Sequence, residues 1–169
     1  TPAVHAAIKA SKTGKIGVIG TRATISSSIY EKKIMDLKPD AKVYSEPCPL
    51  LVSLVEEGWT KRPETTMIIK KYLQPLKTKQ VDTLILGCTH YPLLKDTISR
   101  KIGRQTAIID SGSAVTEAIS NFLSDNQDLA KSLPQNGKID FYVSDVTEQF
   151  EKTASAIVKK KIELVCIKK

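Results

Sequence analysis

The chain has 169 residues, of which 41% are hydrophobic and 26% are charged, and its formal net charge is +8. These values are typical of a globular chain that can bury a core, and they exclude a disordered segment. No apolar run approaches the ~20 residues that cross a bilayer, so we expect no membrane partner. The three cysteines are too few and too scattered for a disulfide framework, which predicts a cytoplasmic protein.

The positive charge raises the question of a nucleic-acid partner. The lysines are spread along most of the chain, no arginine-rich tract occurs, and only 5% of the residues are aromatic and able to stack on bases. A solvated basic surface that also attracts anionic metabolites explains the charge as well. We therefore do not expect nucleic acid to be the main partner.

Short apolar runs alternate with amphipathic stretches along the chain. In chain order, the patterns predict a strand at 15–20, a helix at 24–37, a strand at 41–45, helices at 50–57 and 63–78, a strand at 81–87, a helix at 92–101, a strand at 106–110, a helix at 113–124, a loop at 124–137, a strand at 138–144, a helix at 146–160 and a strand at 162–167. Alternating helices and strands that read as continuous hydrophobic runs are typical of a parallel sheet covered on both faces. The expected fold class is therefore α/β, with a doubly wound parallel sheet.

Three predicted strands end in polar loops, at residues 20–24, 87–90 and 110–113. Ligands of doubly wound sheets bind at the carboxyl ends of the strands, where loops and helix N-termini converge. A single hydroxyl there, such as that of Thr21 or Ser113, is more simply explained as a helix cap. The three loops together favour a binding site for an anion such as a carboxylate.

The segment LILGCTHYPLL, residues 84–94, carries Cys88 to the end of a hydrophobic run. A helix starting near Pro92 would place the thiol before a helix N-terminus, which favours a thiolate, and His90 would be its proton partner. We expect Cys166, in the last apolar run, to lie in the core. A Cys-x-His pair supplies only two ligands and no second pair completes a tetrahedron, so we expect no metal. Neither a P-loop nor a Gly-x-Ser-x-Gly elbow occurs.

Four strings, LILGCTHYPLL, VIGTRATISSSIY, CPLLVSLVEEG and IIDSG, together resemble the glutamate racemases, which are amino-acid racemases of bacterial cell-wall synthesis. The resemblance implies two pseudo-symmetric α/β domains, no cofactor, and one catalytic cysteine from each domain on opposite sides of the substrate α-carbon. By motif, Cys88 matches the second of these cysteines and His90 its partner. The site residues that the motifs imply are Cys88, His90 and Glu56 for catalysis, and Thr21, Thr24 and Thr89 for the substrate.

The same resemblance predicts what this chain lacks. The family's N-terminal half carries a Cys-Asn-Thr motif with the first catalytic cysteine, and that motif is not in this sequence. Cys48 also follows a predicted strand, but its Cys-Pro-Leu context matches a non-catalytic position. We therefore expect one complete α/β domain at 1–109, carrying Cys88, and at 110–169 a return segment of a second domain that is mostly missing.

The expected function is the conversion of L-glutamate to D-glutamate for peptidoglycan, with little activity in this chain alone. The expected partners are glutamate, and the missing N-terminal half or another copy of the chain. Two alternatives stay open at this stage. One is a related aspartate or hydantoin-type racemase, and the other is a non-catalytic remnant that binds anions or nucleic acid.

Overall fold

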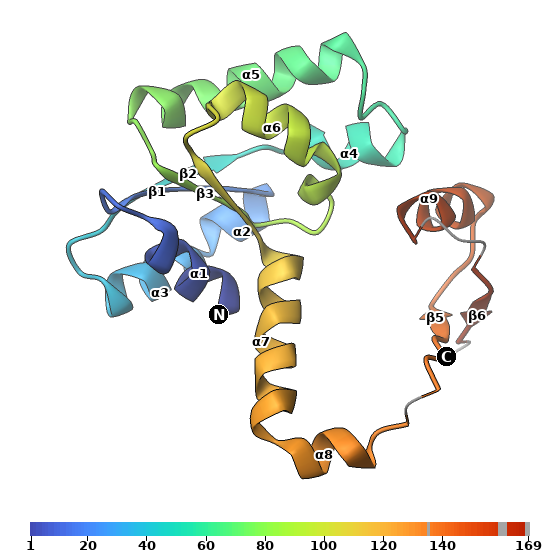
Figure 1. The fold of residues 1–169 in the computed structure, drawn as a ribbon. Coiled ribbons are helices and arrows are strands. Elements are labelled where there is room, and N and C mark those ends of the chain that lie inside the picture. Colours follow the sequence, from blue (N-terminus) through green and yellow to red (C-terminus); the bar gives the residue numbers. More distant parts are fainter. Residues whose placement is uncertain (135, 159–161, 168–169) are drawn as a thin grey trace. The chain divides into compact units, whose positions relative to one another are not determined.

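The computed structural model describes residues 1–134, 136–158 and 162–167, without the side chains at 148, 149, 152 and 156. The chain divides into two compact units, Thr1–Phe122 (unit 1) and Leu123–Lys169 (unit 2) (Figure 1). The division falls inside helix α7 (Ser111–Asp125). The assignment of 110–169 to a second, incomplete domain remains a prediction.

Unit 1 is built on a four-stranded parallel sheet. Its strands are β1 (Lys15–Gly20), β2 (Lys42–Pro47), β3 (Thr83–Leu86) and β4 (Ala107–Asp110), in the order β2-β1-β3-β4. In the centre, Ile16 is in register with Val43 on one side and with Thr83 on the other. The expected α/β class with a parallel sheet is confirmed. The chain leaves β1 toward β2 and returns to the other side of β1 at β3, so the β1/β3 boundary is the topological switch point.

Helices cover both faces of this sheet (Figure 1). One face packs against α4 (Leu50–Glu56), α5 (Pro63–Thr78), the 3-10 helix η1 (Tyr91–Leu94) and α6 (Lys95–Ile102), through buried residues that include Ile19, Leu84 and Leu86. The other face packs against α1 (Pro2–Ala10), α2 (Arg22–Ser26), α3 (Ile29–Leu37) and the start of α7, through Ile16, Val18 and Ile85. Successive strand residues thus alternate between two separate cores, which explains why the strands read as continuous apolar runs.

The helix predicted at 24–37 is two helices. Ser28 adopts a left-handed backbone with φ 53° between α2 and α3, and Ser27 Oγ donates to Thr24 O at 2.7 Å. Serine hydroxyls compete with the backbone in this way, which disfavours a continuous helix through three serines. Helix α1 was not predicted from the sequence. Its buried side, Ala3, Val4 and Ala7, is made of small side chains that give little apolar contrast.

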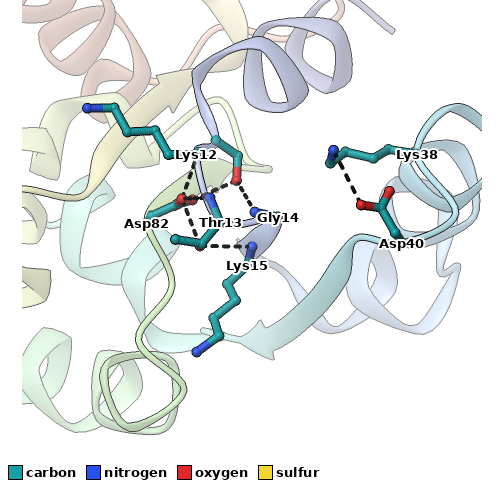
Figure 2. Close-up of polar contacts among 8 residues, drawn as sticks. Lys12, Thr13, Gly14, Lys15, Lys38, Asp40 and Asp82 are labelled. Carbon is teal, nitrogen blue, oxygen red and sulfur yellow. Dashed lines mark hydrogen bonds and ion pairs between the residues drawn. The ribbon is translucent and has the colours of Figure 1, made fainter.

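The amino end of the sheet is held together by Asp82 (Figure 2). Its carboxylate accepts hydrogen bonds from the hydroxyls of Ser11 (2.7 Å) and Thr13 (2.8 Å) and from the backbone N–H groups of Lys12 (2.8 Å) and Thr13 (2.6 Å). Partial burial by itself raises the pKa of Asp82, but hydrogen bonds from Ser11, Thr13 and Thr83 outweigh burial and lower this pKa to about 2. The ionised carboxylate therefore joins the turn before β1 to the start of β3.

Unit 2 contains α8 (Gln127–Ser132), β5 (Phe141–Val143), α9 (Glu148–Val158) and β6 (Leu164–Cys166), and β5 pairs with β6 in parallel. The strands and helix predicted after residue 137 are confirmed in shorter form, although residues 159 and 160 of the predicted helix lie outside the described range. The prediction of a loop at 124–137 is wrong, because α7 extends to Asp125 and α8 follows. The prediction of a core position for Cys166 is also wrong, since its side chain is exposed. In the described residues, no helix is both long and apolar enough to cross a membrane.

Candidate active site

The polar loops after β1 and β3 lie on either side of the switch point, at the carboxyl edge of the sheet. The register pairs Ile19 with Leu86, so the two strands end level with each other. Gly87 N donates to Ile19 O at 2.8 Å and continues this pairing by one residue. The loops that carry Thr21, Thr24, Cys88 and His90 therefore start from adjacent points, where doubly wound sheets bind ligands.

A thiol, an imidazole and a carboxylate form a continuous array at this edge. His90 Nδ1 lies 4.0 Å from Cys88 Sγ, and His90 Nε2 lies 3.3 Å from Glu56 Oε1. The side chains of His90 and Glu56 are 33% and 57% exposed, so ligands and solvent reach the array. In the tautomer whose Nε2–H faces the carboxylate, Nδ1 has a lone pair for the thiol proton. In this geometry the carboxylate can support the charge of an imidazolium formed when His90 takes the thiol proton.

The residue before Cys88, Gly87, lies in close contact with the backbone at the end of β1. A Cβ at position 87 would lie 2.9 Å from Ile19 O and 3.2 Å from the ring of Tyr30, so only glycine fits without a shift. The helix expected from Pro92 starts later as an α-helix, because η1 covers Tyr91–Leu94 and α6 begins at Lys95. Cys88 thus lies in the turn before η1, and its nearest chemical partner is His90.

The threonine residues serve local structure, and one of them, Thr24, packs beside the Cys88 loop. Thr21 caps α2, since Thr24 N donates to Thr21 Oγ1 at 3.2 Å, and the two hydroxyl oxygens lie 3.0 Å apart. The methyl group of Thr24 lies 3.5 Å from the point that a Gly87 Cβ would occupy, so the two loops pack against each other. Thr89 is exposed, with its hydroxyl 3.5 Å from His90 Nδ1. The structure brings the Thr24 loop to the Cys88 loop, and the roles of these threonines remain a proposal.

The third polar loop is used mainly to begin α7. Asp110 Oδ1 accepts hydrogen bonds from Gly112 N (2.8 Å) and Ser113 N (3.2 Å), so the cap is Asp110 rather than Ser113. Ser111 Oγ donates to Leu86 O at 2.8 Å and lies 3.4 Å from the hydroxyl of Tyr30. Ser111, which the sequence did not single out, therefore binds the end of β3, the strand that precedes Cys88.

Cys48, the other thiol of unit 1, does not contribute to this array. Cys48 is fully buried, and burial, with a smaller effect of the Glu46 charge, raises the pKa of its thiol, which stays protonated. Cys166 belongs to unit 2. Among the described residues, no three His, Cys, Asp or Glu side chains form a group that holds a metal ion.

The fold and the array together define an α/β domain with a Cys-His-Glu array at its switch point. Residues 1–119 match the model of the Asp/Glu/Hydantoin racemase family, and the chain belongs to this family. Among curated relatives it is similar to the glutamate racemase of Persephonella marina, at 44% identity over 96% of this chain and 60% of the relative. The glutamate racemase of a Sulfurihydrogenibium strain is 40% identical over 96% of this chain and 61% of its own length.

Solved structures of glutamate racemases are also similar to this chain. A glutamate racemase isoform from Bacillus anthracis superposes with a TM-score of 0.90 at 38% identity, over 98% of this chain and 62% of that one. The glutamate racemase of Francisella tularensis, solved in complex with D-glutamate, has a TM-score of 0.85 at 30% identity, over 98% and 62% of the two chains. The chain thus spans about 60% of the length of the two curated relatives named above.

Proposed function

We propose that this chain supplies one half of a glutamate racemase active site, which interconverts L- and D-glutamate for peptidoglycan synthesis in the cytoplasm. The observation that carries the proposal is the array of Cys88, His90 and Glu56 at the switch point. The similarity to named glutamate racemases supports the amino acid, and the D-glutamate bound to the Francisella tularensis relative supports the ligand.

The proposed chemistry needs an acid and a base on opposite faces of the α-carbon. His90 takes the thiol proton of Cys88, with Glu56 stabilising the imidazolium. The Cys88 thiolate then removes the α-proton of one enantiomer, the C–H bond pair remains on carbon as a carbanion, and an acid on the opposite face returns a proton. The hydroxyls of Thr21, Thr24 and Thr89 are proposed to bind the substrate carboxylates and amine. In the reverse direction, Cys88 donates the proton.

The second acid–base group is proposed to come from the family's N-terminal half. In the part of the chain that the structure describes, the only other thiols are the buried Cys48 and Cys166 of unit 2. Cys48 has no exposed surface, which disfavours it as that group. We propose that residues 110–169 pack against that N-terminal half, with a second copy of the chain as the alternative partner.

The test is reconstitution of racemisation. The chain alone is expected to show little turnover of either glutamate enantiomer, measured by polarimetry or circular dichroism. Addition of the N-terminal segment of the Persephonella marina relative should restore turnover, and Cys88→Ser should abolish it. Cys166→Ser, which removes a thiol of unit 2, is the matched control, and this variant should retain turnover.

Two results would overturn the proposal in different ways. Robust racemisation by the chain alone would show that another group serves the second face. Faster racemisation of aspartate than of glutamate in the reconstituted protein would keep the family and replace the substrate.

A further inference from the structure

The start of α4 is tied to the turn that carries His90. Tyr91, the residue after His90, is fully buried, and its hydroxyl donates to Cys48 O at 2.8 Å across 43 residues of sequence. Cys48 lies just before α4, and its carbonyl also accepts from Leu51 N at 3.2 Å. A single phenol thus joins the backbone beside His90 to the first turn of the helix that ends in Glu56.

The end of α4 is held by a second buried hydroxyl. Gly58, with φ +72°, donates its N–H to Val55 O at 3.0 Å, and Trp59 N donates to Leu54 O at 2.8 Å. These two bonds form a Schellman motif, which terminates the helix directly after Glu56. The hydroxyl of Thr65, which has no exposed surface, donates to Trp59 O at 2.8 Å and ties this turn to α5.

We propose that Tyr91 and Thr65 are positioning residues, which hold α4 at both ends so that the Glu56 carboxylate meets His90. Both members of the His90–Glu56 pair are partly exposed, and exposed pairs hold their own geometry weakly. Hydrogen bonds that fix the backbone on either side of the pair can supply this geometry. The assignment of a catalytic task to the array rests on the proposed function, whereas the positioning itself does not.

The two hydroxyls are suited to this task by their burial. Burial raises the pKa of the Tyr91 phenol, so it remains a neutral donor at every working pH. Tyr91→Phe keeps the ring and removes only the donor, and Cys48 O still accepts from Leu51 N. Thr65→Val likewise keeps the shape, whereas Thr65→Ser keeps the donor and serves as the matched control.

The experiment measures alkylation of Cys88 by iodoacetamide, with Cys166 of the same chain as the internal standard, by peptide mass mapping. Glu56 supports proton transfer from Cys88 to His90, so Glu56→Gln should slow labelling of Cys88 about two- to fivefold, as expected for an exposed pair. Tyr91→Phe and Thr65→Val should slow it in the same direction, and Thr65→Ser should label at the wild-type rate. Circular dichroism melting establishes that each variant is folded.

A double-mutant cycle separates positioning from general loosening. If Tyr91 acts through Glu56, then Tyr91→Phe has no further effect in the Glu56→Gln background. Loosening of the turn would instead expose Cys88 and speed its labelling. Wild-type or faster labelling in Tyr91→Phe and Thr65→Val, an additive double variant, or no effect of Glu56→Gln would each overturn the inference. If the labelling pattern is as expected but the reconstituted protein does not racemise glutamate, the proposed function is wrong and the positioning inference stands.

Discussion

Units 1 and 2 differ in how much of their apolar surface they bury. In unit 1, both faces of the four-stranded sheet are covered, and Leu84, Ile85 and Leu86 of β3 have no exposed surface. In the described part of unit 2, Ile162 is the buried hydrophobic residue, at 5% exposure. Many of its large apolar side chains are exposed, among them Leu129, Leu133, Ile139, Tyr142, Phe150, Ile157, Val165 and Ile167.

The difference has a physical cause. A two-stranded sheet is marginal in water, and three or more strands or a covering layer are needed for independent stability. A high share of exposed large apolar side chains is typical of a segment that packs against something else. We therefore expect unit 1 to fold on its own and unit 2 to need a further layer that covers its apolar side chains.

The largest expected effect is in hydrogen exchange. Amides of β3 should exchange only on global unfolding, whereas those of β5 should exchange through local opening, at least about a thousandfold faster. Addition of the relative's N-terminal segment should slow exchange in β5 and β6 and leave β3 unchanged. Equal protection of Phe141–Val143 and β3 in a monomeric chain would show that unit 2 folds without a partner.

The next largest expected effect is the loss of stability caused by substitutions of apolar residues in the two units. Leu84 lies in the core of unit 1 with no exposed surface, so Leu84→Ala should lower the free energy of unfolding by about 2–5 kcal/mol. Val165, in β6, is 48% exposed, and Val165→Ala should change the free energy of unfolding by less than about 0.5 kcal/mol. Urea unfolding followed by circular dichroism measures both. A comparable loss for Val165→Ala would mean that unit 2 already has a core.

The smallest expected effect concerns pH and the carboxylate at the amino end of the sheet. Because the folded-state pKa of Asp82 is lowered to about 2, its contribution to stability is present above the unfolded pKa of about 4 and is lost as pH falls through about 2. Asp82→Asn should lower the free energy of unfolding at pH 7 by about 1–2 kcal/mol. The difference from wild type should shrink between pH 4 and pH 2, measured by urea unfolding at each pH.

Asp40 is the matched control for Asp82. Its carboxylate pairs with Lys38 at 3.6 Å, and its side chain is 78% exposed (Figure 2). An exposed pair contributes little, so Asp40→Asn should change stability by less than about 0.5 kcal/mol at any pH. A pH dependence as large as that of Asp82 would show that the hydrogen-bond set around Asp82 is not the cause.

Much of the fold follows from local patterns. The inner strands β1 and β3 were predictable because each is an apolar run buried on two faces, and the predicted helix 63–78 coincides with α5. The failures are equally local. Helix α1 has too little apolar contrast, and the break at Ser28 depends on a serine hydroxyl that bonds the backbone. Helix α8 lies in a polar stretch whose turn residues outweighed its helical pattern.

The sequence by itself determined that a thiol and an imidazole lie together at the candidate site, because Cys88 and His90 are two residues apart in one turn. It also determined the parallel α/β class through hydrophobic periodicity. The tertiary structure alone decided the strand order β2-β1-β3-β4, which places the end of α4 beside the turn after β3. Glu56 could be linked to His90 only by family resemblance. No sequence signal linked Tyr91 to Cys48 or Thr65 to Trp59. The Tyr91 hydrogen bond joins segments 43 residues apart, so it exists only once helices and strands have packed. The Thr65 hydrogen bond spans six residues and depends on the turn between α4 and α5.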